Sequence, residues 1–216
     1  MTFSPARVHA YYRAYYRAYY RAYYRALGLA LATLLLVAGL GGGTGCHFQV
    51  ASDPNDPLHG VRNFAVEPVG FNGLTVGNKP EPTYLAEKKP EQQQSWQIDK
   101  AEMARLMVDQ LAQRVGAVGI TLAPPPPGAP PPFVLRINVV QIEPGNFNGF
   151  VNFATQVTMV VDILSPQGQS VGQSPISAQV PATLSNPSSG ERLRMAGQQL
   201  GDRLGHLLLR RTGLGY

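Results

Sequence analysis

The sequence predicts a two-layer α/β (α+β) domain in which two helices pack on one face of a mostly antiparallel sheet of about four strands. Two segments predict the helices, about 99–116 and 189–211, because their apolar residues recur at helical spacing. Three segments predict most of the sheet, about 133–142, 151–164 and 170–180, because apolar residues alternate there with polar ones. Turn residues directly join the last two strands, which makes these strands antiparallel neighbours.

The domain is expected to begin with a strand over 61–69. Phe64 and Val66 share one face of this strand, and Pro68 either ends it or places it at an edge of the sheet. The next segment, 70–97, is rich in Gly, Pro, Lys, Glu and Gln. We expect this segment to be a loop excursion over the surface.

The first helix has clear end signals. Asp99 is the expected N-cap, Glu102 completes a capping-box pattern, and Ile98 can pack on Met103 as a hydrophobic staple. Gly116 suits the C-terminal cap. The apolar side of this helix consists of Met103, Leu106, Met107, Leu111 and Val115.

A run of prolines, 124–132, cannot join a helix or a central strand, so we expect a stiff Pro-rich loop. The strand at 133–142 follows it, and the change of phase at Val140 and Ile142 indicates a bulge or a strand covered on both faces. In the strand at 151–164 one face is apolar. It consists of Val151, Phe153, Val157, Met159, Val161 and Ile163.

The last helix is predicted to start after Ser188, with Glu191 in a capping-box arrangement. Beside its apolar stripe runs a glycine at every fourth position: Gly197, Gly201 and Gly205. Each interior glycine costs about 1 kcal/mol relative to alanine, so three aligned ones indicate a close backbone contact. That contact is either docking against the sheet or a helix–helix interface between subunits. A membrane-spanning dimer is excluded because polar residues occupy the same turns: Asp202, Arg203 and His206.

The first 45 residues have the pattern of a targeting signal. Five arginines and no acidic residue precede an uncharged apolar stretch, 26–40, which is shorter than the roughly 20 residues that span a bilayer. Thr44 and Gly45 then precede Cys46, the only cysteine of the chain. This ending resembles the signal peptide of bacterial lipoproteins, although Gly43 stands where that family usually has an aliphatic residue.

The resemblance implies that 1–45 is removed by cleavage between Gly45 and Cys46. It also implies that Cys46 carries diacylglycerol and palmitate, and that 46–59 is a lipidated tether to a single domain, 60–216. Two alternatives stay open. The leader is either an uncleaved signal anchor or an ordinary secretory signal with an incidental cysteine.

Removing the leader changes the composition. The whole chain has a net charge of +5, but five of its 18 basic residues precede Cys46 and all 13 acidic residues follow it. The remaining chain is formally neutral, which takes away the main support for nucleic-acid binding. With Cys46 committed to lipid no disulfide can form, so the domain must be held together by packing.

The sequence contains no recognisable catalytic or metal-binding pattern. Three histidines remain after the cut, His47, His59 and His206, and they are too scattered to indicate a metal cluster. No serine lies in a nucleophile-elbow pattern. The expectation is therefore a protein that is not an enzyme and that has neither a cofactor nor a metal.

The order of elements and the leader resemble the small periplasmic α/β lipoproteins that assist envelope assembly and export. This resemblance implies a non-catalytic scaffold or accessory subunit with protein partners in the envelope, often a homo-oligomer. His47 stands where Asp would retain a lipoprotein in the inner membrane, so the resemblance favours the outer membrane and its periplasmic face. The alternative is a periplasmic module that binds a lipid or glycan between helices and sheet.

Overall fold

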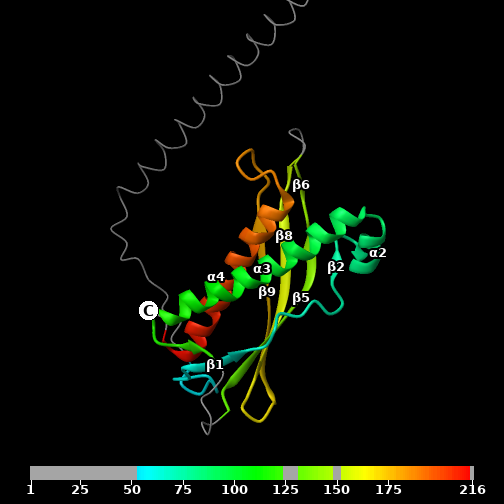
Figure 1. Ribbon diagram of the computed structural model, residues 1–216. Coiled ribbons are helices and arrows are strands. Elements are labelled where there is room, and N and C mark those ends of the chain that lie inside the picture. Colours follow the sequence, from blue (N-terminus) through cyan, green and yellow to red (C-terminus); the bar gives the residue numbers. More distant parts are fainter. Residues whose placement is uncertain (1–52, 124–130, 148–151, 215–216) are drawn as a thin grey trace, which may run out of the picture. The chain divides into compact units, whose positions relative to one another are not determined.

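The structure is a computed structural model that describes residues 53–123, 131–147 and 152–214. Three long strands form the centre of its sheet: β5 (Phe133–Glu143), β8 (Thr155–Leu164) and β9 (Ser170–Val180), each antiparallel to the next. On the other side of β5 lies β1 (Asn63–Val66), which runs parallel to β5 (Figure 1). The predicted fold class is confirmed.

Short strands complete the sheet. β4 (Thr121–Leu122) extends it beyond β1 as a parallel neighbour. β2 (Thr75–Val76) pairs in parallel with the far half of β5, and β3 (Lys79–Pro80) pairs with β2. Another pair forms a separate small hairpin, β6 (Asn146–Phe147) and β7 (Asn152–Phe153). The parallel pairs all involve the short strands β1, β2 or β4. The sheet is mostly antiparallel because its two longest pairs, β5 with β8 and β8 with β9, are antiparallel.

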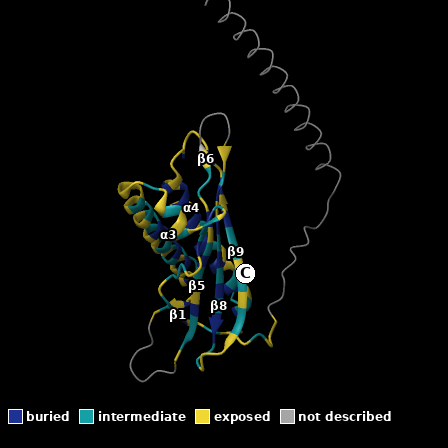
Figure 2. Cartoon of the chain, turned by 90° about the vertical axis from the view of Figure 1, so that its right-hand side faces the viewer, coloured by how far each residue is buried: buried dark blue, intermediate teal, exposed yellow. Residues whose placement is uncertain are grey.

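Two long helices, α3 (Pro90–Gly116) and α4 (Ser189–Thr212), form the second layer. Both lie on the same side of the sheet (Figure 2). Between the layers lies the core, whose side chains are buried: among others Phe64, Leu135, Ile137, Val139, Met159, Val161, Leu200 and Leu204. Burial of such side chains stabilises the fold by roughly 1.5–3 kcal/mol each.

Several predicted details are confirmed. α4 begins after Ser188, whose side chain accepts a hydrogen bond from the backbone N–H of Glu191. β9 has the predicted bounds. The register of β5 shifts between Val139 and Gln141, which is the bulge indicated by the change of phase. The turn before β9 closes through the N–H of Gly168, which donates to the carbonyl of Ser165 at 2.8 Å.

The start of the first long helix was predicted wrongly. α3 begins at Pro90 rather than after Asp99, with Lys89 as N-cap and Gln92 completing the capping box. Proline is favoured in the first turn of a helix because its missing N–H has no partner there anyway. Asp99 lies inside α3 and pairs with Arg194 at 3.2 Å instead of capping. Ile98 is 60% exposed and makes no staple in the core.

The expected excursion over 70–97 is more ordered than a surface loop. It contains β2, β3, a short helix α2 (Glu81–Ala86) and the start of α3. A polar cluster holds α2 onto α3: Glu81 accepts hydrogen bonds from Trp96 and from Lys100, both at 2.7 Å. Polar residues that suggested a surface loop, such as Glu81, therefore make tertiary contacts instead.

Three further expectations need correction. The strand predicted over 151–164 starts at Thr155, and Phe153 belongs to β7 with 60% of its side chain exposed. Gly116 is the last residue of α3 rather than its cap, and the positive φ lies at Gly119. Most of the Pro-rich loop, 124–130, lies outside the described residues.

β9 is an edge strand, since it pairs with β8 alone among the described strands. Exposed edges invite pairing with other chains. Here α4 occupies part of the edge, because Arg211 donates to the carbonyl of Val171 at 3.2 Å and Arg203 donates to that of Ser177. Pro175 lies in phase with these two residues, where its missing N–H leaves no unpaired donor at the edge.

Candidate functional site

The predicted lipidation and cleavage residues, Cys46 and Gly45, lie outside the described residues. Their roles therefore stay predictions. The structure does describe the point at which the chain that follows Cys46 enters the domain.

The chain enters the domain next to the C-terminal end of α4. Arg211 donates two hydrogen bonds to Asp56, from Nε to Oδ2 at 2.8 Å and from Nη2 to Oδ1 at 3.0 Å. The side chain of Leu58 is buried in the core, and the N–H of Gly60 donates to the carbonyl of Thr212 at 2.9 Å. This two-point pairing of a guanidinium with a carboxylate fixes orientation as well as distance.

The entry contacts correct the expected boundary between tether and domain. The tether was expected to reach residue 59, but the folded domain already includes Asp56 and Leu58. The Arg211 guanidinium also holds the pKa of Asp56 below its ordinary value. The chain is therefore attached to the domain by an ion pair with little solvent exposure.

The glycine stripe of α4 contacts α3 of the same chain. A Cβ at Gly197 would overlap the carbonyl oxygen of Met103, and a Cβ at Gly201 would overlap that of Met107. At Gly205 the added carbon would lie 2.6 Å from Cγ of Arg114. The close contact deduced from the sequence is present, but its partner is neither the sheet nor a second subunit. All three glycines are buried between the two helices.

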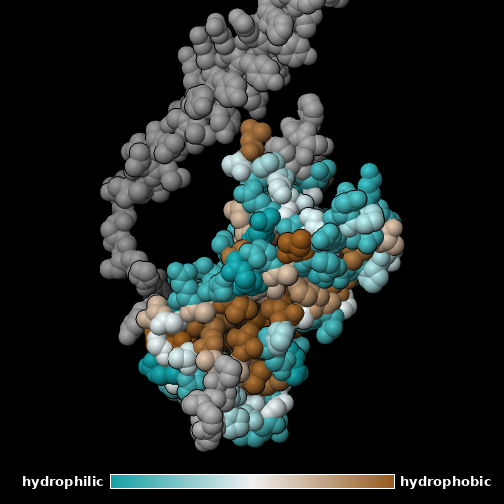
Figure 3. Space-filling model, in the orientation of Figure 1, coloured by the Kyte–Doolittle hydropathy of each residue, from teal (hydrophilic) through white to brown (hydrophobic). Residues whose placement is uncertain are grey.

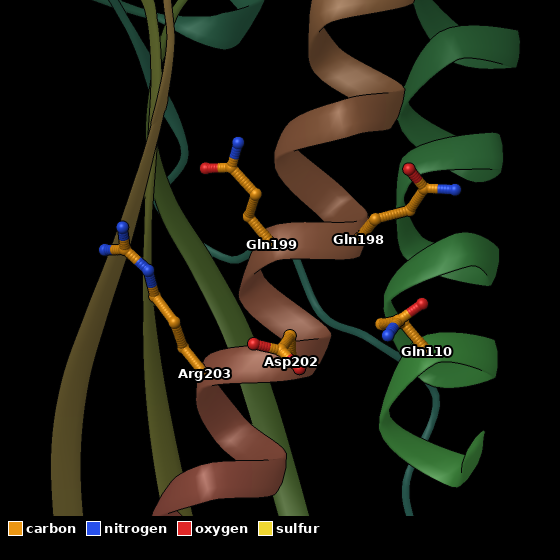
Figure 4. Close-up of a pocket in the computed structure, with 5 residues that line it drawn as sticks. All are labelled: Gln110, Gln198, Gln199, Asp202 and Arg203. Atoms are coloured by element: carbon orange, nitrogen blue, oxygen red, sulfur yellow. The ribbon is translucent and has the colours of Figure 1, made fainter. Parts of the chain in front are cut away.

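A shallow depression of about 430 Å³ lies on the outer side of the helix layer. It is lined by Gln110 of α3 and by Gln198, Gln199, Asp202 and Arg203 of α4 (Figure 4). Gln110 and Gln198 lie between the helices, while Gln199 and Arg203 point toward β9. The lining offers hydrogen-bond donors and acceptors to a polar group, but it holds no paired nucleophile and base.

His206 lies on the outer side of the same two helices. Its ring nitrogens contact Arg114, and its Nε2 lies 3.5 Å from Oδ2 of Asp202. Arg114 in turn lies 3.6 Å from Oδ1 of Asp202. The three side chains are about half exposed and link α3 to α4, so they form a surface contact between helices.

An apolar area is visible on the face of the molecule that carries α3. Figure 3 shows apolar side chains gathered between α3 and β1. Val66, Val69 and Phe71, in β1 and the segment after it, are partly buried against the core. Lys100 of α3 lies over the Phe71 ring, with Nζ 4.5 Å from the ring centre. This area continues the core to the surface.

The part of the chain that the structure describes contains neither a metal-binding cluster nor a membrane-spanning helix. Within 53–123, 131–147 and 152–214 no three histidine, cysteine or acidic side chains gather to hold a metal ion. No helix in these ranges combines the length and the apolar character needed to cross a bilayer.

Arg192 is a functional candidate that the sequence analysis missed. Its guanidinium is 1% exposed and has no acidic partner among the described residues; burial lowers its pKa. A signal was present, since Arg192 stands four residues before Ala196 on the apolar stripe of α4. A charged residue at a core position of a helix requires an explanation in terms of its partners.

The partners of Arg192 are neutral oxygens from three segments. Nε donates to Oγ1 of Thr155 at 2.9 Å, and Nη2 donates to the carbonyl of Pro144 at 3.1 Å. Nη1 donates to the carbonyls of Asn186, at 3.2 Å, and Pro187. Arg192 thus joins the chain before β6, the start of β8 and the loop before α4.

No protein-family model and no curated protein matches the chain. Solved structures resemble it distantly. Protein XCC0632 of Xanthomonas campestris, of family DUF330, is 14% identical with a TM-score of 0.43, over 74% of this chain and 90% of that one. A minor lipoprotein of Acinetobacter baumannii is 14% identical with a TM-score of 0.37, over 70% and 90%.

The PelC dodecamer of Paraburkholderia phytofirmans is also similar, at 13% identity and a TM-score of 0.37, over 72% of this chain and 91% of that one.

Proposed function

We propose that this protein is a lipid-anchored lipoprotein of the outer membrane that faces the periplasm and serves as a non-catalytic scaffold or accessory subunit of an envelope assembly or export system. Its support is the leader with its small residues before Cys46, together with the absence of any catalytic motif in the sequence. Protein partners in the envelope, including further copies of the chain, belong to this proposal.

The entry of the chain into the domain is the observation that carries the proposal. Nine residues lie between Cys46 and Asp56, where the chain is fixed to the end of α4. Such a segment spans at most about 35 Å when fully extended. A lipid on Cys46 would therefore hold the C-terminal end of α4 near the membrane surface, with the rest of the domain available to partners.

The filled core weighs against the alternative function, a module that holds a lipid between helices and sheet. The side chains between the two layers are buried against one another. A lipid between the layers would have to displace these side chains. Forcing packed side chains apart costs several kcal/mol. Binding of a glycan in the polar depression is a second alternative. The glutamine amides that line the depression can donate and accept hydrogen bonds.

Metabolic labelling with a fatty-acid analogue tests the anchoring. The wild-type chain is expected to take up the label and to fractionate with membranes. Cys46→Ser is expected to do neither, because serine offers no thiol for the lipid. Gln49→Ala, a change in the tether that keeps Cys46, is the control and is expected to label fully. Equal labelling of Cys46→Ser and the wild type would overturn the proposal.

A further inference from the structure

The end of the domain opposite to the chain entry exposes two large apolar side chains. Leu184, in the loop before α4, is 87% exposed, and Phe153, in β7, is 60% exposed. We name the described residues 144–147, 152–155 and 181–190 the distal tip. Figure 1 shows its two parts beside each other at the end of the sheet where α4 begins. The entry lies at the other end of α4.

Arg192 holds the two parts of the distal tip together. Its bonds to Pro144 and Thr155 reach one part, and its bonds to Asn186 and Pro187 reach the other. Thr155 closes the arrangement by donating from Oγ1 to the carbonyl of Pro144 at 2.6 Å. A buried guanidinium is costly, and its four hydrogen bonds offset that cost only in one arrangement of the loops. The two loops that carry the exposed side chains are thus held in one arrangement.

The loop that carries Leu184 also has bonds of its own. Thr183 and Asn186 form a β-bridge, and Nδ2 of Asn186 donates to the carbonyl of Pro181 at 3.3 Å. In the other part, Gly145 has a φ of +66°, and a Cβ there would overlap the carbonyl oxygen of Phe153. Because these loops are ordered, their backbone loses little conformational freedom on binding.

None of the described residues 144–147, 152–155 and 181–190 is charged, although the exposed carboxylates of Glu143 and Glu191 border the tip. Contacts with anionic membranes use Lys and Arg together with Trp and Tyr. The tip has none of these four residue types. The cores of protein–protein interfaces are depleted of charge and enriched in aromatic residues. The chemistry of the tip therefore favours a protein over a lipid surface.

The position of the distal tip agrees with this choice. α4 has 24 residues and is about 36 Å long, and the entry and the tip lie at its two ends. A chain anchored at the entry end presents the tip away from its own membrane when the domain stands upright. This step rests on the proposed lipid anchor.

The small apolar area of the tip indicates that its partner offers a pocket rather than a flat surface. Leu184 and Phe153 together expose on the order of 300 Å². A standard interface needs about 800 Å² on each partner, so two tips placed against each other are too small for a stable dimer. Protruding apolar side chains of this kind bind as anchors in a pocket of the partner.

We propose that the distal tip docks the protein onto a partner protein by inserting Leu184 and Phe153 into a concave, apolar and uncharged pocket. Asparagine, serine and threonine side chains around the two anchors supply the polar rim of this contact, as in other interfaces.

Site-specific photo-crosslinking in the full-length chain tests the proposal. A photoreactive phenylalanine analogue replaces Leu184 in one variant and Phe153 in another. Ile98 of α3, as exposed as Phe153 and also apolar, takes the same analogue as the matched control. We expect both tip positions to crosslink to the same peptide of one partner protein, a peptide made of apolar and uncharged residues. The control position is expected not to do so.

A second variant tests the role of the anchors. Leu184→Asp in the chain that carries the probe at position 153 is expected to lower the yield of this crosslink at least about tenfold, because a charge would enter an apolar pocket. Leu184 is almost fully exposed, so the change leaves folding intact.

Each other outcome overturns the proposal. These outcomes are products with lipid alone, a product at twice the mass of the chain, a partner peptide rich in charged residues, equal products from the control position, or no product. Fatty-acid labelling of the same samples shows separately whether the anchor is in place. A chain that labels normally and gives no tip crosslink overturns the docking surface and leaves the anchoring proposal standing.

Discussion

Asp56 and Arg211 make the attachment of the tether sensitive to acid. Arg211 keeps the pKa of Asp56 below its ordinary value of 3.8, which is the value expected in the unfolded chain. The carboxylate therefore adds stability that is fully present above about pH 4. That stability is lost as the pH falls through the pKa of the folded state.

Asp56→Asn is expected to lower the free energy of unfolding at pH 7 by about 1–2 kcal/mol, since the pair is mostly shielded from solvent. Urea titrations at pH 7 and pH 3 measure this difference, which should shrink at pH 3. Glu67→Gln is the control, because Glu67 makes a similar but more exposed pair with Arg136 and should change stability less. An equal loss in both variants would contradict the assignment.

Arg192 is expected to be the least replaceable charged residue of the domain. Arg192→Lys should destabilise the fold by about 2–4 kcal/mol, because an ammonium group cannot reach oxygens on three segments at once. Thermal or urea unfolding measures the loss. Arg210→Lys, on the exposed side of α4, is the control and should stay within about 0.5 kcal/mol of the wild type.

Secondary-structure elements show where the sequence was informative and where it was not. The bounds of β9 and the start of α4 followed from alternation, turn residues and the Ser188 cap, all of which are local signals. The start of α3 was missed because two local start signals compete, one at Pro90 and one at Asp99, and the contacts of Trp96 and Lys100 with Glu81 favour the earlier one. Such contacts join segments whose approach no local pattern encodes.

The glycine stripe of α4 was predicted in part. Its spacing revealed a close backbone contact but could not name the partner, which is α3. Arg192 was missed for a related reason, since its oxygen partners come from backbone carbonyls that every residue possesses.

Gly201→Ala is expected to cost about 1–3 kcal/mol in spite of alanine's higher helix propensity, because its methyl group would overlap the carbonyl of Met107. Gly116→Ala is the matched control. It lies at the end of α3 with open space around the added carbon, and alanine there should gain up to about 1 kcal/mol. Urea unfolding of the two variants should give changes of opposite sign. A gain at Gly201 would mean that the helices are not in close contact.

At the scale of the whole molecule, the domain has an entry end and a distal tip at the two ends of α4. The proposed membrane anchor belongs to the first and the proposed partner contact to the second. The sequence predicted the layers of the domain, but it could not predict these two ends, because the entry pair spans residues 56 and 211 and the tip joins separate loops.

His47→Asp is expected to move the protein from the outer-membrane to the inner-membrane fraction of a Gram-negative host, if sorting follows the residue after Cys46 as it does in the lipoproteins that the leader resembles. Density-gradient separation of the membranes measures the shift. His59→Asp, which lies within the folded domain, is the control and should leave the distribution unchanged. A His47→Asp protein that stays in the outer-membrane fraction would contradict sorting by residue 47, and a wild-type protein in the inner-membrane fraction would contradict the outer-membrane proposal.

Mass spectrometry of the N-terminal peptide of the protein purified from membranes tests the central claim most directly. The account predicts a peptide that starts at Cys46 and carries diacylglycerol with an added acyl chain, and no peptide from residues 1–45. A peptide that continues from the leader through an unmodified Cys46 would contradict it.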